Sequence, residues 1–509
     1  MNGLTGGLIG KVALFRKASV KLYFCAAMST SAEQLLPAII AHAKEYGFVF
    51  PSSEIYDGLG AVYDYGPYGS ELKKNIRDYW WKSMTQLHEN IVGIDAAIFM
   101  HPTTWKASGH VDNFSDPMID NRDSKKRYRV DHLLEAKAEE LTQQGDTVGA
   151  QALLEKMDSL LAAEDFVSLK QLLIDYKIVC SVSGTGNWTD IRQFNLMFAT
   201  QLGSVAEESD TIYLRPETAQ GIFVNFLNVQ KTARMKIPFG IAQTGKAFRN
   251  EIVARQFIFR MREFEQMEMQ FFVRPGTEGE WYKYWKEARL QWHLRLGIAP
   301  EKYRFHDHVK LAHYAKEACD IEFQFPFGFK EVEGIHSRSD FDLTQHQQYS
   351  KKKMQYFDNE INQNYVPYVI ETSIGLDRMF LLILSNAYEE EQLTKEDGSA
   401  DSRVVLHIPT VLAPIKLAIL PLTKKDGLPE VARELMNECK PYFKCFYEEK
   451  DAIGKRYRRQ DAIGTPFCVT IDHQTLVDKT VTIRYRDTMV QERVLMSSIR
   501  ELVSSQLQG

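Results

Sequence analysis

The sequence lacks the features that mark disulfide scaffolds, zinc ribbons and membrane-spanning proteins. Its 509 residues include only six cysteines, and no two of them form a Cys-x-x-Cys pair. This usage favours a reducing compartment over a disulfide framework. The longest unbroken apolar runs, residues 22–28 and 379–384, are far shorter than the ~20 residues that a bilayer-spanning helix needs. The pattern therefore excludes a membrane-spanning protein, and we expect a cytoplasmic one.

The sequence also lacks a strong excess of either charge. There are 62 lysines and arginines against 67 aspartates and glutamates, which gives a net charge of −5. This balance does not indicate a nucleic-acid partner, but it leaves room for a local basic face. Hydrophobic residues make up 44% and charged residues 25%, as in ordinary globular domains. At about 150 residues per domain, the length predicts about three domains.

Acidic residues are absent before Glu33, whereas four lysines and arginines precede it. Two interpretations stay open for this stretch: a cleaved targeting segment, or sequence upstream of a true start at Met28. Because the patterned sequence begins only near Ala32, we expect residues 1–31 to be an extension. It would be disordered or not native and would carry none of the chemistry.

The first patterned region, residues 32–129, is rich in aromatic residues. Apolar residues recur in it at helical spacing from Leu72 to Ile91, and an apolar stretch then leads to Pro102. This pattern predicts a long amphipathic helix followed by a strand.

Three further regions differ in composition. Residues 130–177 are rich in Ala, Leu, Glu, Gln and Lys, which predicts a helical insertion. Residues 178–409 mix aromatic and β-branched runs with helical segments, and the alternation over 262–271 predicts a strand. Residues 410–509 alternate between strand and helix patterns, which predicts a small α/β domain. Its predicted strands are 416–420, 467–471 and 480–485, and its predicted helix is 429–439.

The spacing of Gly240, Gly245 and Lys246 matches the phosphate-binding loop of a P-loop nucleotidase. The next residue of such a loop is Ser or Thr, whose hydroxyl binds magnesium, but here it is Ala247. Residues 248–251 also lack the helix-start signal that should follow. We therefore disfavour a P-loop and keep it as an alternative.

The residues that follow this segment combine basic, acidic and aromatic side chains. Residues 248–251 (Phe-Arg-Asn-Glu) and 260–264 (Arg-Met-Arg-Glu-Phe) place three arginines and two acids between aromatic residues. A guanidinium can bind phosphate through two parallel hydrogen bonds, and an aromatic ring nearby can stack on a base. The pattern alone leaves two interpretations open: a nucleotide site, or a strand hairpin with a solvated charged face.

Together with a third stretch, these segments resemble the class II aminoacyl-tRNA synthetases. Residues 248–251 and 260–264 are similar to the second signature motif of that family, and residues 365–378 are similar to the third, a strand followed by a helix. The predicted helix and the strand up to Pro102 are similar to the first motif, which forms the dimer interface in the family. Further stretches resemble the homodimeric glycyl-tRNA synthetases within it: residues 52–56, 63–67, 109–110 and 215–221.

The resemblance implies a fold of three parts. They are an α+β catalytic core built on an antiparallel sheet flanked by helices (class II synthetase-like, residues 32–129 and 178–409), a helical insertion (130–177) and a C-terminal α/β anticodon-binding domain (410–509). The implied reaction is the ATP-dependent attachment of glycine to tRNA-Gly through a glycyl-adenylate, which makes the chain an aminoacyl-tRNA ligase. The implied state is a homodimer without a membrane partner. The alternative on the same fold is a non-charging, synthetase-like RNA-binding paralogue.

The resemblance also assigns side chains to ATP and Mg²⁺, the implied cofactors. Arg249 is expected to bind the α-phosphate, Arg260 and Arg378 the distal phosphates, and Glu331 the Mg²⁺ ion, since charge on the transferring phosphates must be neutralised. Phe264 is expected to stack on adenine. The implied catalytic residues are Arg249, Glu331 and Arg378. The implied ATP-binding residues are Arg249, Asn250, Glu251, Phe259, Arg260, Met261, Arg262, Glu263, Phe264, Glu331, Val332, Gly375, Leu376, Asp377 and Arg378.

The implied amino-acid pocket suits glycine physically. An α-ammonium needs carboxylates, and Glu217, Glu268 and Glu371 offer three, while Ser373 can occupy the space of a larger side chain. Because no amino acid is smaller than glycine, an editing domain is not required. The implied glycine-binding residues are Arg129, Glu217, Phe264, Glu265, Gln266, Met267, Glu268, Glu371, Thr372, Ser373, Ile374 and Gly375.

Residues 450–459 form the clearest basic cluster of the expected anticodon-binding domain. Tyr457 lies between the charges, and an aromatic beside arginines suits unstacked RNA bases. The other interpretation is a solvated basic strand edge. The expected tRNA-binding residues are Lys455, Arg456, Arg458 and Arg459.

The sequence departs from the family pattern at two positions. Thr372 stands where the third motif commonly has proline, so the fixed backbone angle of proline is missing. Cys180 stands alone where relatives can carry paired cysteines. Because one thiol cannot build a four-ligand site, we expect no structural zinc.

Overall fold

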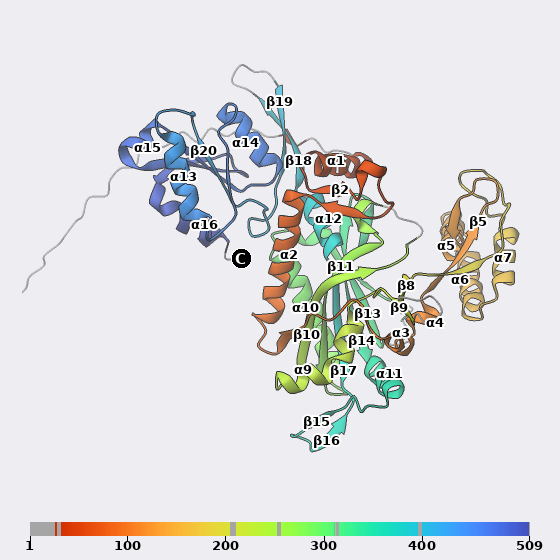
Figure 1. Cartoon of the computed structure of the whole chain (residues 1–509). Coiled ribbons are helices and arrows are strands. Elements are labelled where there is room, and N and C mark those ends of the chain that lie inside the picture. The colour runs from red at the N-terminus through yellow and green to blue at the C-terminus, as the bar shows by residue number, and fades with distance from the viewer. Residues whose placement is uncertain are drawn as a thin grey trace, which may run out of the picture. The chain divides into compact units, whose positions relative to one another are not determined.

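The computed structural model describes residues 26–27, 32–203, 210–251, 256–309, 311, 315–394 and 400–507. They form two compact units (Figure 1): a larger unit built mainly from Ser31–Ala387 and Ile408–Pro414, and a C-terminal unit built mainly from Tyr388–His407 and Ile415–Ser505. The expected extension, residues 1–31, lies outside the described residues except for two alanines and so stays a prediction.

A seven-stranded sheet forms the centre of the larger unit. Neighbouring strands run antiparallel, except that β4 and β10 pair in parallel. The predicted antiparallel core flanked by helices is confirmed. In sheet order the strands are β12 (Tyr303–Asp307), β13 (Glu317–Phe325), β14 (Gly328–Ser339), β17 (Tyr368–Gly375), β11 (Glu263–Val273), β10 (Phe239–Phe248) and β4 (Ile91–Gly93).

Three helices build the surroundings of the site on this sheet. Helices α2 (Pro67–Thr85) and α10 (Glu278–Leu294) meet at Tyr79 and Trp292, whose ring centroids are 5.5 Å apart. Helix α12 (Leu376–Ala387) follows β17 directly and packs on α2 and β11. The strand-then-helix pattern predicted for residues 365–378 is therefore confirmed.

The helix predicted from Leu72 to Ile91 is shorter than expected. Helix α2 ends at Thr85, Leu87 beyond it is exposed, and Ile91 opens β4 and pairs with β10. The strand that follows, β4, is also shorter than expected: it ends at Gly93. Pro102 does not end a strand but begins helix α3 (Pro102–Ala107). The last two apolar residues matched helical spacing without belonging to the helix, since one faces solvent and the other fills a sheet position.

The glycine-rich segment 240–247 lies inside β10, which pairs with β11 along its full length. A phosphate-binding loop presents successive free backbone N–H groups at the start of a helix. Here the backbone is committed to the sheet, and no helix follows directly. The P-loop alternative is therefore wrong.

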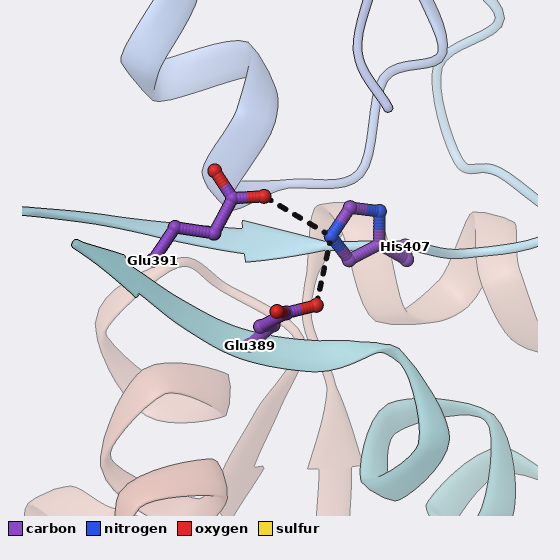
Figure 2. Close-up of side chains that lie close together, drawn as sticks. All are labelled: Glu389, Glu391 and His407. Atoms are coloured by element: carbon purple, nitrogen blue, oxygen red, sulfur yellow. Dashed lines mark ion pairs between the residues drawn. The ribbon is translucent and has the colours of Figure 1, made fainter. Parts of the chain in front are cut away.

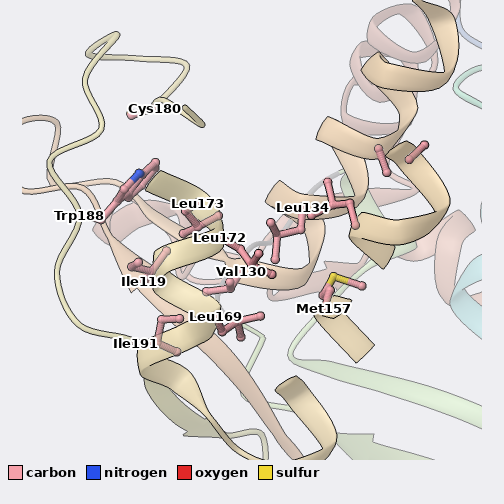
Figure 3. Close-up of a cluster of buried hydrophobic side chains, with 13 residues drawn as sticks. Ile119, Val130, Leu134, Met157, Leu169, Leu172, Leu173, Cys180, Trp188 and Ile191 are labelled. Carbon is pink, nitrogen blue, oxygen red and sulfur yellow. The ribbon is translucent and has the colours of Figure 1, made fainter. Parts of the chain in front are cut away.

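The predicted helical character of residues 130–177 is confirmed by helices α5 (Val130–Gln143), α6 (Thr147–Ala162) and α7 (Phe166–Asp175). Asp146 and Asp165 cap α6 and α7, where their carboxylates accept hydrogen bonds from backbone N–H groups of the first turn. The helices cover a small sheet, β6 (Arg127–Arg129), β5 (Ser115–Asp120) and β7 (Arg192–Asn195). Figure 3 shows the apolar core of this insertion, which includes Val130, Leu134, Leu169, Leu173 and Trp188.

The C-terminal unit matches its predicted elements closely. A five-stranded mixed sheet has the order β21-β20-β22-β23-β24, and a β18–β19 hairpin accompanies it. The strands predicted at 467–471 and 480–485 are β22 and β23. The elements are β18 (Tyr388–Thr394), β19 (Ala400–Leu406), β20 (Leu417–Pro421), α13 (Leu428–Cys439), β21 (Cys445–Tyr447), α14 (Ile453–Ala462), β22 (Phe467–Ile471), α15 (His473–Asp478), β23 (Thr480–Tyr485), β24 (Gln491–Leu495) and α16 (Ile499–Gln506).

Shorter elements complete the larger unit, whereas β1 (Ala26–Ala27) pairs with β18 in the C-terminal unit. Among the helices that the structure describes, none is both long and apolar enough to cross a bilayer. The remaining elements are α1 (Ala32–Glu45), β2 (Val49–Pro51), β3 (Tyr63–Tyr65), α4 (His110–Asn113), β8 (Ala199–Leu202), β9 (Asp210–Tyr213), α8 (Ala219–Val224), α9 (Phe226–Thr232), α11 (Phe341–Ser350), β15 (Tyr356–Asp358) and β16 (Gln363–Tyr365).

Candidate active site

A polar pocket opens where β11, β17 and the start of α12 meet. Because β17 pairs with β11 and leads straight into α12, residues far apart in the sequence converge at this point. Most of the expected ATP-binding residues line it. The pocket is lined by Arg249, Glu251, Ile258, Phe259, Arg260, Met261, Phe264, Glu265, Gln266, Glu331, Ser373, Gly375, Asp377 and Arg378.

Arg249 lies just beyond the end of β10 and is held in a defined orientation. Its Nε donates a hydrogen bond of 3.1 Å to the carbonyl of Pro216. Its guanidinium lies over the ring of Phe264, 5.2 Å from the centroid, and 5.5 Å from that of Phe114. Packing against two aromatic rings leaves the edge of the guanidinium available for a fork-like phosphate contact.

Arg378 lies in the first turn of α12 and faces Glu331. Their side chains form an ion pair of 2.8 Å, and Arg378 also donates hydrogen bonds to the carbonyls of Glu331 and Phe259. The positive charge of Arg378 lowers the pKa of Glu331. This pair keeps a cation and an anion side by side at the mouth of the pocket.

Asp377 and Glu265 also line the pocket, but each is tied into the framework beneath it. Asp377 accepts hydrogen bonds from the Tyr65 hydroxyl, from Lys73 Nζ at 2.7 Å and from the backbone N–H of Glu265 at 2.7 Å. Glu265 pairs with Lys73 at 3.4 Å and with Arg77 at 2.8 Å. These contacts fasten α2 to the floor of the pocket.

The three expected glycine-pocket carboxylates are brought together. The side-chain amide of Gln270 donates to Glu268 at 2.7 Å and to Glu371 at 2.6 Å, and Thr218 donates to Glu268. Burial together with the charges of Glu371 and Glu217 raises the pKa of Glu268. Carboxyl groups that crowd one another in a desolvated place suit a small cation such as an ammonium group, because its positive charge would relieve their mutual repulsion.

Several cationic partners of this cluster were not found from the sequence. His110 Nε2 lies 3.5 Å from Glu217. Burial alone would raise the pKa of Glu217, but His110 and the positive charge of Arg338 outweigh it, so the pKa is lowered. Arg338 donates to Glu371 at 2.9 Å, and His336 Nδ1 lies 2.7 Å from the other oxygen of Glu371. The alternation along β14 puts His336 and Arg338 on one face, which is the signal that could have found them.

Strand alternation separates the remaining expected glycine-binding residues. Gln266 and Ser373 face the pocket and hydrogen-bond each other at 3.3 Å. Met267 and Ile374 are register partners on β11 and β17, and both are fully buried, as is Thr372. Their side chains therefore do not line this pocket, and the glycine-binding role of these three residues stays a prediction.

The other expected ATP-binding residues divide in the same way. Val332 and Leu376 are buried in the core, so their side chains do not line the pocket. Arg262 donates to the carbonyls of Glu251 and Gly60 and thereby braces the loop. Two further side chains lie outside the lining: Asn250, and Glu263, which pairs with Lys246.

Arg129 is not brought to the carboxylate cluster. It ends β6 and pairs with Asp116 at 3.1 Å and with Asp131 at 2.5 Å. These residues line a separate pocket beside the insertion together with Asp112 and Glu164.

The basic cluster of the C-terminal unit forms helix α14 and not a strand edge. Arg456 is 1% exposed, and its guanidinium donates to the carbonyls of Pro421, Leu422 and Glu448. A buried guanidinium that saturates three carbonyls cannot reach an RNA, so the expectation of a direct tRNA contact by Arg456 is corrected.

The other three residues of this basic cluster are more accessible. Lys455 and Arg458 are exposed, whereas Arg459 is half-buried. Arg458 pairs with Asp401, and Arg459 pairs with Glu448 at 2.7 Å. Lys455 is therefore exposed without such a carboxylate partner among the described residues, which makes it the most accessible charge of the cluster.

Comparison with protein families finds three matches along the chain. Residues 198–387 match the tRNA synthetase class II core domain (G, H, P, S and T). Residues 116–152 and 147–196 match the glycyl-tRNA synthetase insertion domain 1, and residues 416–506 match an anticodon binding domain. The three predicted parts of the fold correspond to these matches.

The chain is also similar to curated glycine--tRNA ligases over almost its whole length. That of Chlorobaculum tepidum is 53% identical over 471 residues, which cover 92% of this chain and 99% of the relative. The one from Treponema denticola is 50% identical over 474 residues, or 92% and 97%. The one from Staphylococcus haemolyticus is 50% identical over 477 residues, or 93% and 99%. The arginine-lined pocket, the carboxylate cluster and these matches agree, and the chain belongs to the glycine--tRNA ligase family.

Proposed function

We propose that this chain activates glycine with ATP and transfers it to the terminal adenosine of tRNA-Gly. The observation that carries the proposal is the joining of two features in one site. A pocket with three arginines and aromatic rings is partly lined by strands β11 and β17. The same two strands carry Glu268 and Glu371, and Glu217 lies close enough to act on Glu268 by its charge. The first suits a nucleoside triphosphate, and the second suits an amino-acid ammonium.

In the activation step, a carboxylate oxygen of glycine attacks the α-phosphorus, the bond to the β-phosphate breaks, and pyrophosphate leaves. No side chain has to act as a nucleophile, so positioning and charge neutralisation supply the catalysis. Arg249 binds the α-phosphate, and Arg260 and Arg378 bind the departing phosphates. Phe264, with Arg249 over its ring, stacks on adenine.

Mg²⁺ fits the donor set around Glu331. Burial and the charge of Glu331 raise the pKa of Asp320 on the neighbouring strand β13, so two carboxylates share one region. Oxygen ligands of this kind suit a hard divalent cation. Glu331 would hold Mg²⁺, which neutralises phosphate charge when bound, while Arg378 keeps the carboxylate turned toward the pocket.

Glycine is recognised by charge and by crowding. Glu217, Glu268 and Glu371 bind the α-ammonium, and the Ser373–Gln266 pair leaves no room for a side chain. Rejection of larger amino acids by steric clash needs no editing step.

Four further proposals accompany this function. The chain is a homodimer, supported by the likeness of α2 and β4 to the dimer-forming motif, and it works in the cytoplasm. Lys455, Arg458 and Arg459 contact tRNA from α14, since their side chains are at least partly accessible. The Cys180 site holds no structural zinc, because its thiol is hydrogen-bonded by Ser124 and Tyr128.

Charging of tRNA-Gly with labelled glycine tests this function. The full chain, with ATP and Mg²⁺, should esterify glycine to tRNA-Gly and leave tRNA-Ala uncharged. A chain that binds ATP and tRNA-Gly but forms no glycyl-tRNA would support the non-charging paralogue instead.

A further inference from the structure

A histidine and two glutamates converge in the C-terminal unit, outside the site described above (Figure 2). Glu389 and Glu391 are two residues apart on β18, so their side chains share one face of the strand. His407 follows β19, the other strand of the hairpin. Its Nε2 lies 3.3 Å from Glu389 Oε2 and 3.5 Å from Glu391 Oε1.

The histidine ring is oriented from its other side. Nδ1 of His407 lies 2.6 Å from Asp487 Oδ1, and Asp487 in turn accepts two hydrogen bonds from Arg486. A carboxylate on Nδ1 fixes which nitrogen carries the proton and points the other toward a ligand. Arrangements of this kind orient the histidine ligands of metal ions.

The atom that points into the cluster makes no hydrogen bond. Nε2 of His407 is buried and has no hydrogen-bond partner among the described residues, although the two carboxylates lie within ion-pair distance. Glu391 uses its second oxygen, Oε2, for Arg403 and leaves Oε1 facing His407. The three donor atoms therefore converge on a common centre and lie within 4.8 Å of one another.

The spacing of these atoms matches the ligand shell of a transition metal. Zinc bonds to imidazole nitrogen and carboxylate oxygen are about 2.0–2.2 Å long, so neighbouring ligands in a tetrahedron are about 3.3–3.5 Å apart. The two N···O distances, 3.3 and 3.5 Å, fall in this range. We propose that Glu389, Glu391 and His407 form a zinc-binding site at the base of the β18–β19 hairpin.

Charge and access agree with this assignment. Two carboxylates and a neutral imidazole balance the charge of Zn²⁺, and a nitrogen ligand favours zinc over Mg²⁺ or Ca²⁺. Three protein ligands leave the fourth position for water. The Glu389 side chain is 41% exposed and that of His407 is 26% exposed, so the ion can enter from solvent. Bound zinc would tie the hairpin to the segment that carries Asp487.

Equilibrium dialysis of the full chain against Zn²⁺, with metal counted by mass spectrometry, tests the proposal. Excess Mg²⁺ is present and ATP is absent, so the nucleotide pocket does not contribute. We expect one zinc ion per chain, and we expect His407→Ala to weaken binding at least 100-fold and Glu389→Gln about tenfold. The matched control is His473→Ala, which removes an exposed histidine paired with Asp426 at 2.9 Å and should change nothing.

Two further readouts keep the proposal testable if His407→Ala folds poorly. Zinc should raise the unfolding temperature of the wild type and have a smaller effect on Glu389→Gln, whose partly exposed side chain can be replaced without leaving a cavity. Cobalt in place of zinc should give the spectrum of nitrogen and oxygen ligands. Binding that survives both substitutions, thiolate-to-cobalt charge transfer, or no bound zinc at all would overturn the proposal.

Discussion

Replacement of Arg378 by alanine probes the phosphate-binding role that the pocket geometry gives this residue. The change removes an ion pair of 2.8 Å to Glu331 and hydrogen bonds to two carbonyls. Because the side chain is 24% exposed, these contacts are partly screened, and the free energy of unfolding should fall by only about 1–2 kcal/mol. The fold should therefore survive.

The effect on catalysis should be much larger than the effect on folding. A preorganised donor to developing charge contributes about 2.7–4 kcal/mol, which corresponds to about a 100- to 1000-fold loss in kcat. Glycine-dependent exchange of pyrophosphate into ATP should fall by this factor, while the Kd for tRNA-Gly stays within about twofold. Arg378→Lys should recover part of the rate, since it keeps the charge but not the planar fork.

The matched control is Arg127→Ala in the insertion. It removes an arginine–carboxylate pair of similar length, 2.7 Å to Asp120, but far from any phosphate contact in the proposed scheme. Its exchange rate should equal that of the wild type. If Arg378→Ala exchanged at the wild-type rate, or lost tRNA binding instead, the assignment of Arg378 to the phosphates would be refuted.

Substitutions of charged and titratable side chains elsewhere in the fold should have distinct effects on stability and on binding. Glu333→Gln should lower the free energy of unfolding, measured by urea titration, by about 3–5 kcal/mol. The reason is that buried Arg289 and His293 lose the carboxylate that pairs with them. A loss below about 1 kcal/mol would contradict this expectation. Lys455→Ala should weaken tRNA binding without destabilising the chain, whereas Arg456→Ala should destabilise it, and the reverse outcome would restore Arg456 as a contact. His110→Ala should raise the KM for glycine several-fold at unchanged kcat, because the partner of Glu217 is lost. Since the pKa of Glu217 is held low in the fold, its stabilising contribution is present above pH ~4.3 and fades as pH falls through the lowered pKa. The stability gap between His110→Ala and the wild type should therefore narrow in acid, and a constant gap would argue against the pairing.

Local patterns predicted much of the fold because a single periodicity dominated each segment. The helices of the insertion and the strands β22 and β23 follow directly from composition and alternation. The helix expected up to Ile91 failed because an exposed leucine and a strand residue happened to continue the helical spacing. Spacing alone does not distinguish a buried residue from one that faces solvent.

Helical geometry explains why the basic cluster of α14 was only partly predictable. Residues 456 and 460 lie one turn apart on the buried face of the helix, while 455 and 458 lie on the exposed side. A count of basic residues treats all of them as one patch. The carbonyls that accept from Arg456 belong to the end of β20, to Leu422 just after it, and to Glu448 before α14. Nothing in the local pattern around Arg456 indicates that the fold brings these carbonyls together.

A β-bulge explains the different fates of Glu331 and Glu333. Two residues apart on β14, they should share a face, but the register shifts opposite Ile321 and Glu322, so Val332 is an extra residue. Glu331 consequently faces the pocket, whereas Glu333 is buried with Arg289. Sequence resemblance selected the glutamate that lines the pocket, and alternation alone would not have done so.

In the proposed function, the carboxylate cluster and the arginine pocket act together on glycine. Amino-acid-dependent exchange of pyrophosphate into ATP tests it most directly, because it reports adenylate formation without tRNA. Exchange should require glycine and Mg²⁺ and should stay at background with alanine or serine. Exchange with alanine or serine at a rate comparable to glycine, or none with glycine, would contradict the account.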